Sequence, residues 1–176
     1  MGLNGAGKTS LLKIIAGVAE TDAGSFRLGH GVSLGYYAQE HEGIADGVPV
    51  LTHVREEFTE ASDQDLRALL GMFGLTGAVA FQDAGTLSGG EKTKLALAQL
   101  VAGRRNLILL DEPTNNLDPP SRTAVAEALG GWKGSMVLVS HDAGFVRALA
   151  PQRALMMPEG ELGYWNDGLL ELVALA

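Results

Sequence analysis

Residues 2–9 have the spacing of a phosphate-binding loop. Their sequence, GLNGAGKT, fits the pattern G-x-x-x-x-G-K-[ST]. Glycines let the backbone curl around a phosphate and point several N–H groups at it. Lys8 adds a positive charge for the β- and γ-phosphates, and the Thr9 hydroxyl is a suitable ligand for Mg²⁺. The loop predicts a nucleoside triphosphate and magnesium as ligands, contacted by Gly2, Asn4, Gly5, Ala6, Gly7, Lys8, Thr9 and Ser10.

The segment that follows the loop has the pattern of a helix. Leu11, Leu12 and Ile15 recur at helical spacing, and Gly17 is a stop signal. The N-terminus of this helix would point at the phosphates, where its dipole favours anions. The alternative is a glycine-rich turn before an ordinary helix, which does not account for the motifs farther along the chain.

Two acidic residues follow a predicted buried strand. Residues 107–110 are wholly apolar, as expected of a parallel strand covered on both faces, and Asp111 and Glu112 come directly after them. Ligands of open α/β sheets collect at this end of the strands. Asp111 is therefore a candidate ligand of Mg²⁺, and Glu112 is a candidate base for an attacking water. The alternative is a pair of solvated loop acids.

Two further polar residues belong to the same row of loops. The apolar run 136–139 predicts a second strand buried on both faces, and His141 follows it within reach of a γ-phosphate. Gln39 follows a strand predicted over 32–37 and can touch the metal ion or the water. A lone histidine is more often structural, and Gln39 is weak evidence by itself.

A second glycine turn begins a predicted helix. Residues 88–90 read Ser-Gly-Gly, which leaves backbone N–H groups free at a helix N-terminus and is typical of an anion site. The alternative is a simple N-cap. Because one P-loop does not need two phosphate cradles, we expect the second turn to serve a nucleotide bound to another subunit or domain.

The elements that must position these residues alternate between strand and helix. We expect further strands over 25–28, 153–157 and 161–165. Helices are expected over 89–101, over 118–130 with Asp118 as cap, over 143–149, and up to 175 with Asp167 as cap. Residues 49–84 carry two apolar helical faces, with Ser62 or Asp63 as a cap and Gly74 as a stop. The predicted class is α/β, a mostly parallel sheet with a helical insert at about 49–84.

The position of the P-loop predicts a partial domain. A P-loop normally follows a buried strand, whereas only Met1 precedes Gly2 here. Losing four or five buried aliphatic side chains removes roughly 6–15 kcal/mol, as much as the stability of a whole domain. We therefore expect residues 1–176 to be one partial domain that lacks this strand and is marginally stable alone.

The composition of the chain excludes several classes of protein and several kinds of site. The chain has 176 residues, 46% hydrophobic and 19% charged, which suits one globular domain. No apolar run is long enough for a transmembrane helix, and no signal peptide is visible. The net charge of −8 argues against broad nonspecific binding of nucleic acid. The absence of cysteine excludes disulfides and thiolate metal sites, and it agrees with a cytoplasmic location.

The order of the motifs resembles that of an ATP-binding cassette (ABC) ATPase. Six motifs occur in sequence over nearly the whole chain: the P-loop, Gln39, LSGGE at 87–91, LILLDEP at 107–113, NNLD at 115–118 and SHD at 140–142. In detail the chain is similar to the ABC-F subfamily, soluble twin-cassette proteins that act on ribosomes. Residues 35–39, 87–98 and 111–118 carry this resemblance, and the C-terminal segment resembles that of a second cassette.

The resemblance implies a role for each motif. Lys8 and Thr9 would bind phosphate and Mg²⁺, and Gln39 would sense the γ-phosphate and contact the metal. Asp111 would support the metal, Glu112 would polarise water, and His141 would stabilise the transferred phosphoryl group. The signature residues that would complete the site of an opposite cassette are Leu87, Ser88, Gly89, Gly90 and Glu91, and Asp118 would lie in the D-loop between the two cassettes.

The resemblance also implies ligands and partners. These are ATP and Mg²⁺, a second cassette in the same full-length chain or in a homodimer, and the ribosome through regions outside this chain, with no direct membrane insertion. The chain departs from the subfamily in lacking the aromatic residue that stacks on adenine and the ribosome-entering linker, and in having Asn116 and Ala143 where histidine and arginine are frequent. Two alternatives remain, the ATP-binding subunit of a membrane transporter that grips a permease, and an inactive fragment.

Overall fold

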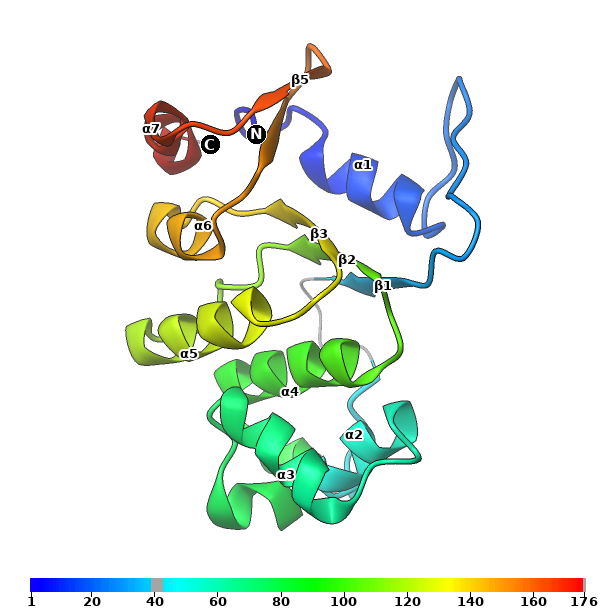
Figure 1. The fold of residues 1–176 in the computed structure, drawn as a ribbon, viewed down its shortest axis with the longest axis vertical. Helices are drawn as coiled ribbons and strands as arrows, with labels where there is room; N and C mark the ends of the chain where they lie inside the picture. The colour runs from blue at the N-terminus through cyan, green and yellow to red at the C-terminus, as the bar shows by residue number, and fades with distance from the viewer. Residues whose placement is uncertain (39–42, 176) are drawn as a thin grey trace.

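A parallel three-stranded sheet lies at the centre of the molecule (Figure 1). The computed structural model describes residues 1–38 and 43–175. The strands β1 (Leu34–Tyr37), β2 (Leu107–Asp111) and β3 (Ser135–Val139) are adjacent in that order. Because both strand pairs are parallel, the carboxyl ends of all three strands meet at one edge of the sheet. This arrangement confirms the predicted α/β class.

Helices cover the two sides of the sheet. Figure 1 shows α1 (Lys8–Ile15) on one side and α4 (Gly89–Ala102) and α5 (Pro119–Gly130) on the other. The α6 helix (Ala143–Leu149) packs against α5, and α7 (Leu170–Leu175) packs against α6. Among the described residues, no helix combines the length and the apolar character needed to cross a membrane.

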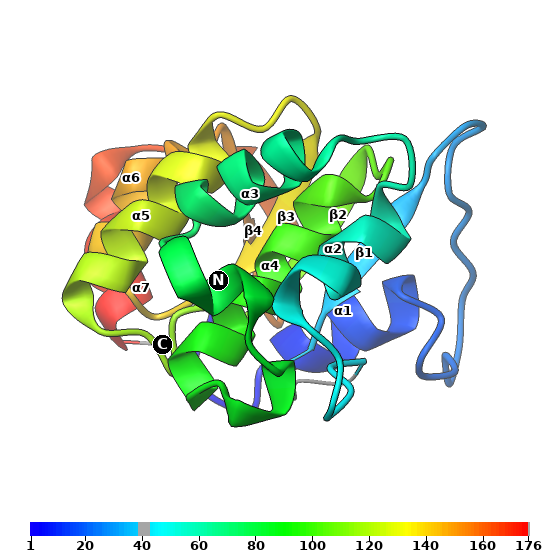
Figure 2. The same ribbon diagram turned by 90° about the horizontal axis from the view of Figure 1, so that it is seen from below.

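The short helices predicted within 49–84 are present. They are α2 (Val50–Glu57), α3 (Asp63–Met72) and the 3₁₀ turns η1 (Gly77–Phe81) and η2 (Ala84–Thr86). The helices α2 and α3 lie on the side of α4 that faces away from the sheet (Figures 1 and 2). Ser62 caps α3 by accepting the Asp65 N–H at 3.2 Å, and Gly74 follows the helix with φ +73°. Local cap and stop signals therefore placed this helix correctly.

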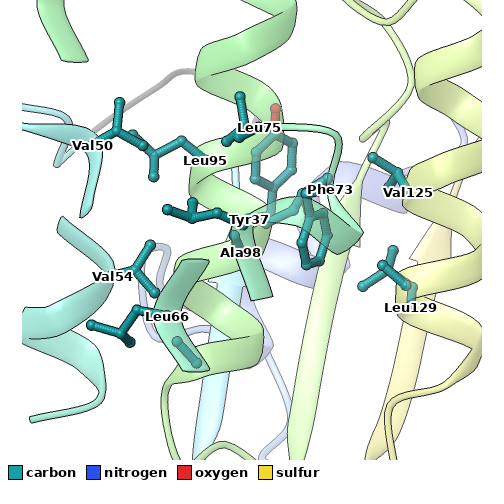
Figure 3. Packing of buried hydrophobic residues seen from close by; sticks show 14 of the residues in the cluster. Tyr37, Val50, Val54, Leu66, Phe73, Leu75, Leu95, Ala98, Val125 and Leu129 are labelled. Atoms are coloured by element: carbon teal, nitrogen blue, oxygen red, sulfur yellow. The ribbon is translucent and has the colours of Figure 1, made fainter. Parts of the chain in front are cut away.

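One apolar cluster joins the sheet to these helices. Tyr37 from β1, Leu95 from α4 and Val125 from α5 are buried in it together with Phe73, which follows α3 (Figure 3). Since each fully buried aliphatic or aromatic side chain contributes about 1.5–3 kcal/mol, this cluster fixes α4 and α5 against the sheet. The α4 helix begins at the Ser88 turn, and Asp118 is the N-cap of α5.

The structure corrects several predictions from the sequence. Residues 25–28 form no strand, because no described segment pairs with their backbone, and Phe26 and Leu28 are exposed. The strand predicted over 32–37 begins at Leu34. The strand β3 is not buried on both faces, since Val137 is 40% exposed and β2 is its one described neighbour.

The C-terminal predictions are nearly correct. The predicted pair of strands is present as antiparallel β4 (Arg153–Met156) and β5 (Glu161–Tyr164), each ending one residue earlier than predicted. Asp167 does not cap the last helix; it lies in the first turn of the 3₁₀ helix η3 (Asp167–Leu169), whose N-cap is Asn166. The sequence around residue 167 contains no pattern that predicted this additional 3₁₀ turn.

Truncating the buried Phe73 tests the cluster. Phe73 is fully buried, so Phe73→Ala is expected to lower the free energy of unfolding by about 3–5 kcal/mol. Urea unfolding followed by circular dichroism measures the change. The matched control is Phe81→Ala, because Phe81 is 58% exposed; its effect is expected to stay within about 0.5 kcal/mol. Equal effects of the two substitutions would contradict this packing.

Candidate functional site

The P-loop places Lys8 over its own backbone. Gly5 and Gly7 have φ values of +85° and +90°, which favour glycine, and Gly7 begins α1 without a side-chain cap. The Lys8 ammonium group donates to the carbonyl oxygens of Gly2 and Leu3, the latter at 3.3 Å. The loop therefore combines a cation with an uncapped helix N-terminus, the two features that bind a phosphate group.

Gly2 is needed for a reason that the sequence did not reveal. A Cβ at this position would lie 2.3 Å from the carbonyl oxygen of Met157, and the residue has φ +147°. The glycine thus allows the start of the chain to pass close to the end of β4. Its role here is close packing of two backbones, in addition to the predicted role in the phosphate loop.

Thr9 and Asp111 meet at the edge of the sheet. Thr9 lies in the first turn of α1, Asp111 is the last residue of β2, and the Thr9 hydroxyl donates to Asp111 Oδ1 at 3.2 Å. A hydroxyl and a carboxylate oxygen are the kinds of donor that Mg²⁺ binds. Within residues 1–38 and 43–175 no group of three or more His, Cys, Asp or Glu side chains forms a metal site. The pair therefore suits Mg²⁺ that also binds phosphate and water, rather than a metal enclosed by protein.

Glu112 and His141 form an ion pair beside these residues. Glu112 Oε2 lies 3.1 Å from His141 Nε2 and also accepts the backbone N–H of His141 at 3.3 Å. Glu112 has φ +48°, an uncommon conformation for a residue other than glycine, and such strain clusters at functional sites. The Glu112 N–H donates to Val139 O at 2.9 Å, which ties the loop after β2 to the end of β3.

The environment of Glu112 favours its neutral form. The side chain is 9% exposed, and Oε1 has no hydrogen-bond partner among the described residues. Burial raises the pKa of Glu112 above its ordinary value, and the nearby charge of Asp111 adds to this. The charges of His141 and Lys8 oppose the rise. A buried carboxylate with one oxygen unpaired is able to accept a hydrogen bond and a proton from a small molecule.

The Ser88 turn is a complete N-cap. Ser88 Oγ accepts the Glu91 N–H at 3.3 Å, and Glu91 Oε2 accepts the Ser88 N–H at 2.9 Å and the hydroxyl at 2.7 Å. This capping box shows that Ser88 is an N-cap, and it holds the pKa of Glu91 below its usual range. It leaves Gly89 exposed, and a Cβ added there would meet no atom within 4 Å.

The Ser88 turn lies against the loop between β2 and α5, not against the P-loop. A Cβ on Gly90 would lie 2.6 Å from the carbonyl oxygen of Asn116, so only glycine fits. Asp118 caps α5 by accepting the Ser121 N–H at 2.9 Å, and this bond lowers the pKa of Asp118. None of the hydrogen bonds among the described residues links the Ser88 turn to Lys8 or Thr9. The structure thus separates two groups that the sequence predicts, one around the P-loop and one around Ser88.

The structure brings together most of the first group. Thr9, Asp111, Glu112 and His141 converge at the carboxyl edge of the sheet, as predicted. Gln39 lies outside the described residues. Sequence reasoning missed Arg122, which connects two loops of this site; no motif marks it, although its place four residues after Asp118 puts it one helical turn from that cap.

Comparison with known proteins gives concordant matches. Residues 1–115 match the sequence profile of the family described as "ABC transporter". The "Probable ATP-binding protein YheS" of Haemophilus influenzae is 43% identical over 148 residues, which are 84% of this chain and 23% of that protein. The "Probable ATP-binding cassette sub-family F member 3 homolog" of Encephalitozoon cuniculi is 41% identical over 172 residues, 97% of this chain and 30% of that protein.

A solved structure shares the fold. The "RNase-L Inhibitor" superposes with a TM-score of 0.73 and 25% identity, covering 92% of this chain and 32% of that one. The chain thus spans less than a third of each of these proteins. The resemblance to ABC ATPases and to sub-family F, predicted from six motifs, is confirmed.

The burial of Glu112 predicts a pH-dependent effect on stability. A carboxyl whose native pKa is raised destabilises the fold once it ionises, and the penalty grows as the pH rises through that pKa. We expect Glu112→Gln to leave Tm unchanged at pH 4 and to raise it at pH 8 by about 2–4 °C, the effect of about 1 kcal/mol in a chain of this size.

Thermal unfolding at the two pH values measures this difference. The control is Glu159→Gln, which replaces an exposed carboxylate and should change Tm at neither pH. A lower Tm of Glu112→Gln at pH 8 would show that the ion pair with His141 outweighs the cost of burial.

Proposed function

The chain belongs to the ABC transporter family, and from this premise we propose that it binds ATP with Mg²⁺ and contributes to ATP hydrolysis. The observation that supports this most strongly is the convergence of four side chains at the carboxyl edge of the sheet, namely Thr9, Asp111, Glu112 and His141. Together these side chains would supply metal binding, a base for the water and a donor to the phosphoryl group, which phosphoryl transfer to water requires.

In this proposal the P-loop and the metal pair position the triphosphate. Lys8 exchanges the carbonyl oxygens of Gly2 and Leu3 for phosphate oxygens, and the uncapped N-terminus of α1 adds its N–H groups. Thr9 and Asp111 would hold Mg²⁺, which neutralises charge on the phosphates when bound. The charge of Lys8 lies close enough to lower the pKa of Glu112, so a phosphate held by Lys8 would lie near the loop that carries Glu112.

Glu112 and His141 would act on the water and on the transferred group. The unpaired Oε1 of Glu112 orients the water and receives its proton while the bond from water oxygen to phosphorus forms and the bond to ADP breaks. His141, whose side chain is 43% exposed, would donate to an oxygen of the phosphoryl group. The charge of His141 opposes the rise that burial causes in the pKa of Glu112, and so favours the form that can accept a proton.

The Ser88 turn supports a partnership with a second cassette. Gly89 is exposed and unobstructed, and the turn has no described hydrogen bond to the P-loop of its own chain. A nucleotide on a second cassette, in the same full-length protein or in a homodimer, would meet the backbone N–H groups at the start of α4 and the exposed Asp118. ATP would then join the two cassettes, and hydrolysis would release them.

The sub-family F relatives support a ribosomal role for the complete protein. Two relatives, at 41% and 33% identity, carry that subfamily in their names. We propose by this likeness that the motion of the two cassettes is coupled to a ribosome-bound state through regions outside this chain. Co-sedimentation of the complete protein with ribosomes, and not with membranes, separates this proposal from the transporter alternative.

Replacing the proposed base tests the assignment of Glu112. Glu112→Gln keeps the size of the side chain and removes its ability to accept a proton, so ATP turnover is expected to fall by about 10²–10⁴-fold. ATP binding should persist, because Glu112 is not a P-loop residue. Phosphate release and nucleotide titration measure the two quantities, with Glu159→Gln as an exposed control. Turnover equal to that of the wild-type protein would refute the role of Glu112.

Mixing two inactive variants tests the shared site in a homodimer. Lys8→Ala removes the phosphate charge, and Gly89→Asp places a negative charge in the signature turn at a position with free space. Each variant alone should hydrolyse little ATP. An equal mixture should recover about one quarter of wild-type activity, since random pairing leaves both halves intact in that share of sites. Absence of recovery, although the variants dimerise, would contradict a site shared between two copies.

A further inference from the structure

Arg122 occupies a place that helix stability does not explain. It is the fourth residue of α5, close to the helix N-terminus. The helix dipole disfavours a positive charge at this end. A cation here therefore needs favourable contacts elsewhere.

Two contacts of Arg122 join different loops. Its Nε donates to the carbonyl oxygen of Leu117 at 3.0 Å, and its Nη1 donates to Asp142 Oδ2 at 2.8 Å. Leu117 is buried and belongs to the loop after β2, whereas Asp142 belongs to the loop after β3. The planar guanidinium, with its fixed fork of donors, suits two acceptors in different directions, and a lysine would reach one of them.

Two further hydrogen bonds hold Asp142 in place. Its Oδ1 accepts the Phe145 N–H at 2.9 Å and so caps α6, while its backbone N–H donates to Ser140 Oγ at 3.1 Å. Its side chain is 19% exposed. A shift of Asp142 would therefore also shift Ser140 and the intervening His141.

Arg122 thus provides a second tie between the two loops. The first tie is at Glu112, at the start of the loop after β2, where Oε2 receives both contacts from His141 and the backbone N–H donates to Val139 O. Arg122 adds the second near the other end of that loop, beside Asn116, whose carbonyl oxygen touches Gly90. With both ties present, His141, Glu112 and the base of the Ser88 turn form one connected unit.

We propose that Arg122 is a positioning residue that couples the loop of His141 to the loop of Glu112 and Asn116, an inference that rests on the proposed ATPase for its catalytic consequence. In the described part of the chain, the hydrogen bonds of the Arg122 side chain go to Leu117 and Asp142 and not to the P-loop. Its loss should therefore lower kcat by about 10- to 100-fold through misplacement of His141, and leave KM for ATP unchanged.

Amide hydrogen exchange of the nucleotide-free chain tests the coupling without any need for activity. The reporter is the His141 N–H, which donates to Glu112. Arg122→Met removes both contacts, and Asp142→Asn removes the charge but keeps a side chain that caps α6 well. Each substitution should speed exchange of this amide at least several-fold, and the double variant should be no faster than the faster single variant. Arg122→Lys should have an intermediate effect.

The control is Arg104→Met, which breaks an exposed ion pair with Glu60 and should leave exchange at His141 unchanged. Unaltered exchange in Arg122→Met, or additive effects in the double variant, would overturn the proposal. If circular dichroism shows that Arg122→Met does not fold, the same comparison of single and double variants is made with Arg122→Lys and Asp142→Asn.

Activity of the complete protein gives the second readout. A lower kcat at unchanged KM in Arg122→Met supports the positioning role, whereas a raised KM alone overturns it. If the wild-type protein hydrolyses no ATP, the proposed function fails, and the exchange cycle alone decides whether Arg122 couples the two loops.

Discussion

The parallel pairing of β1, β2 and β3 is the constraint on which the candidate site depends. Parallel strands end at the same edge, so residues 37, 111 and 139 bring three loops to one place although they are far apart in the sequence. The register aligns Asp111 with Val139, so the loops that carry Glu112 and His141 begin side by side. The contact between these two side chains thus depends on the strand register as well as on their chemistry.

The same edge concentrates unfavourable features. Glu112 is nearly buried, has a left-handed backbone conformation, and leaves one carboxylate oxygen unpaired among the described residues. Each feature costs free energy that the apolar cluster around Phe73 and Leu95 must offset. A strained, dry acid is of little use for stability. It is suited to accepting a proton at the moment when a water molecule attacks a phosphate.

The sequence predicted what depends on local chemistry. The caps at Ser62, Ser88 and Asp118 are confirmed, because a side chain and a backbone N–H three residues later meet in any helix that begins there. The glycines of the P-loop are likewise recognisable, since their backbone conformations and spacing belong to a short segment.

Features that depend on distant partners could not be predicted in this way. Residues 25–28 have the composition of a strand, but a strand needs a neighbour to pair with, and composition does not say whether one is present. The exposure of Val137 has the same origin, because burial of a strand depends on what lies beside it. Arg122 was missed because its acceptors, Leu117 and Asp142, are brought together by the packing of α5 against α6.

The two glycines of the Ser88 turn, Gly89 and Gly90, differ in their surroundings. Gly90 has a carbonyl oxygen of Asn116 against it, so its lack of a side chain is fully explained by contact within the chain. Gly89 has nothing near it, and neither its packing nor its backbone conformation requires glycine. In the proposed function, the absence of a side chain at Gly89 would let a phosphate bound from outside approach the backbone closely.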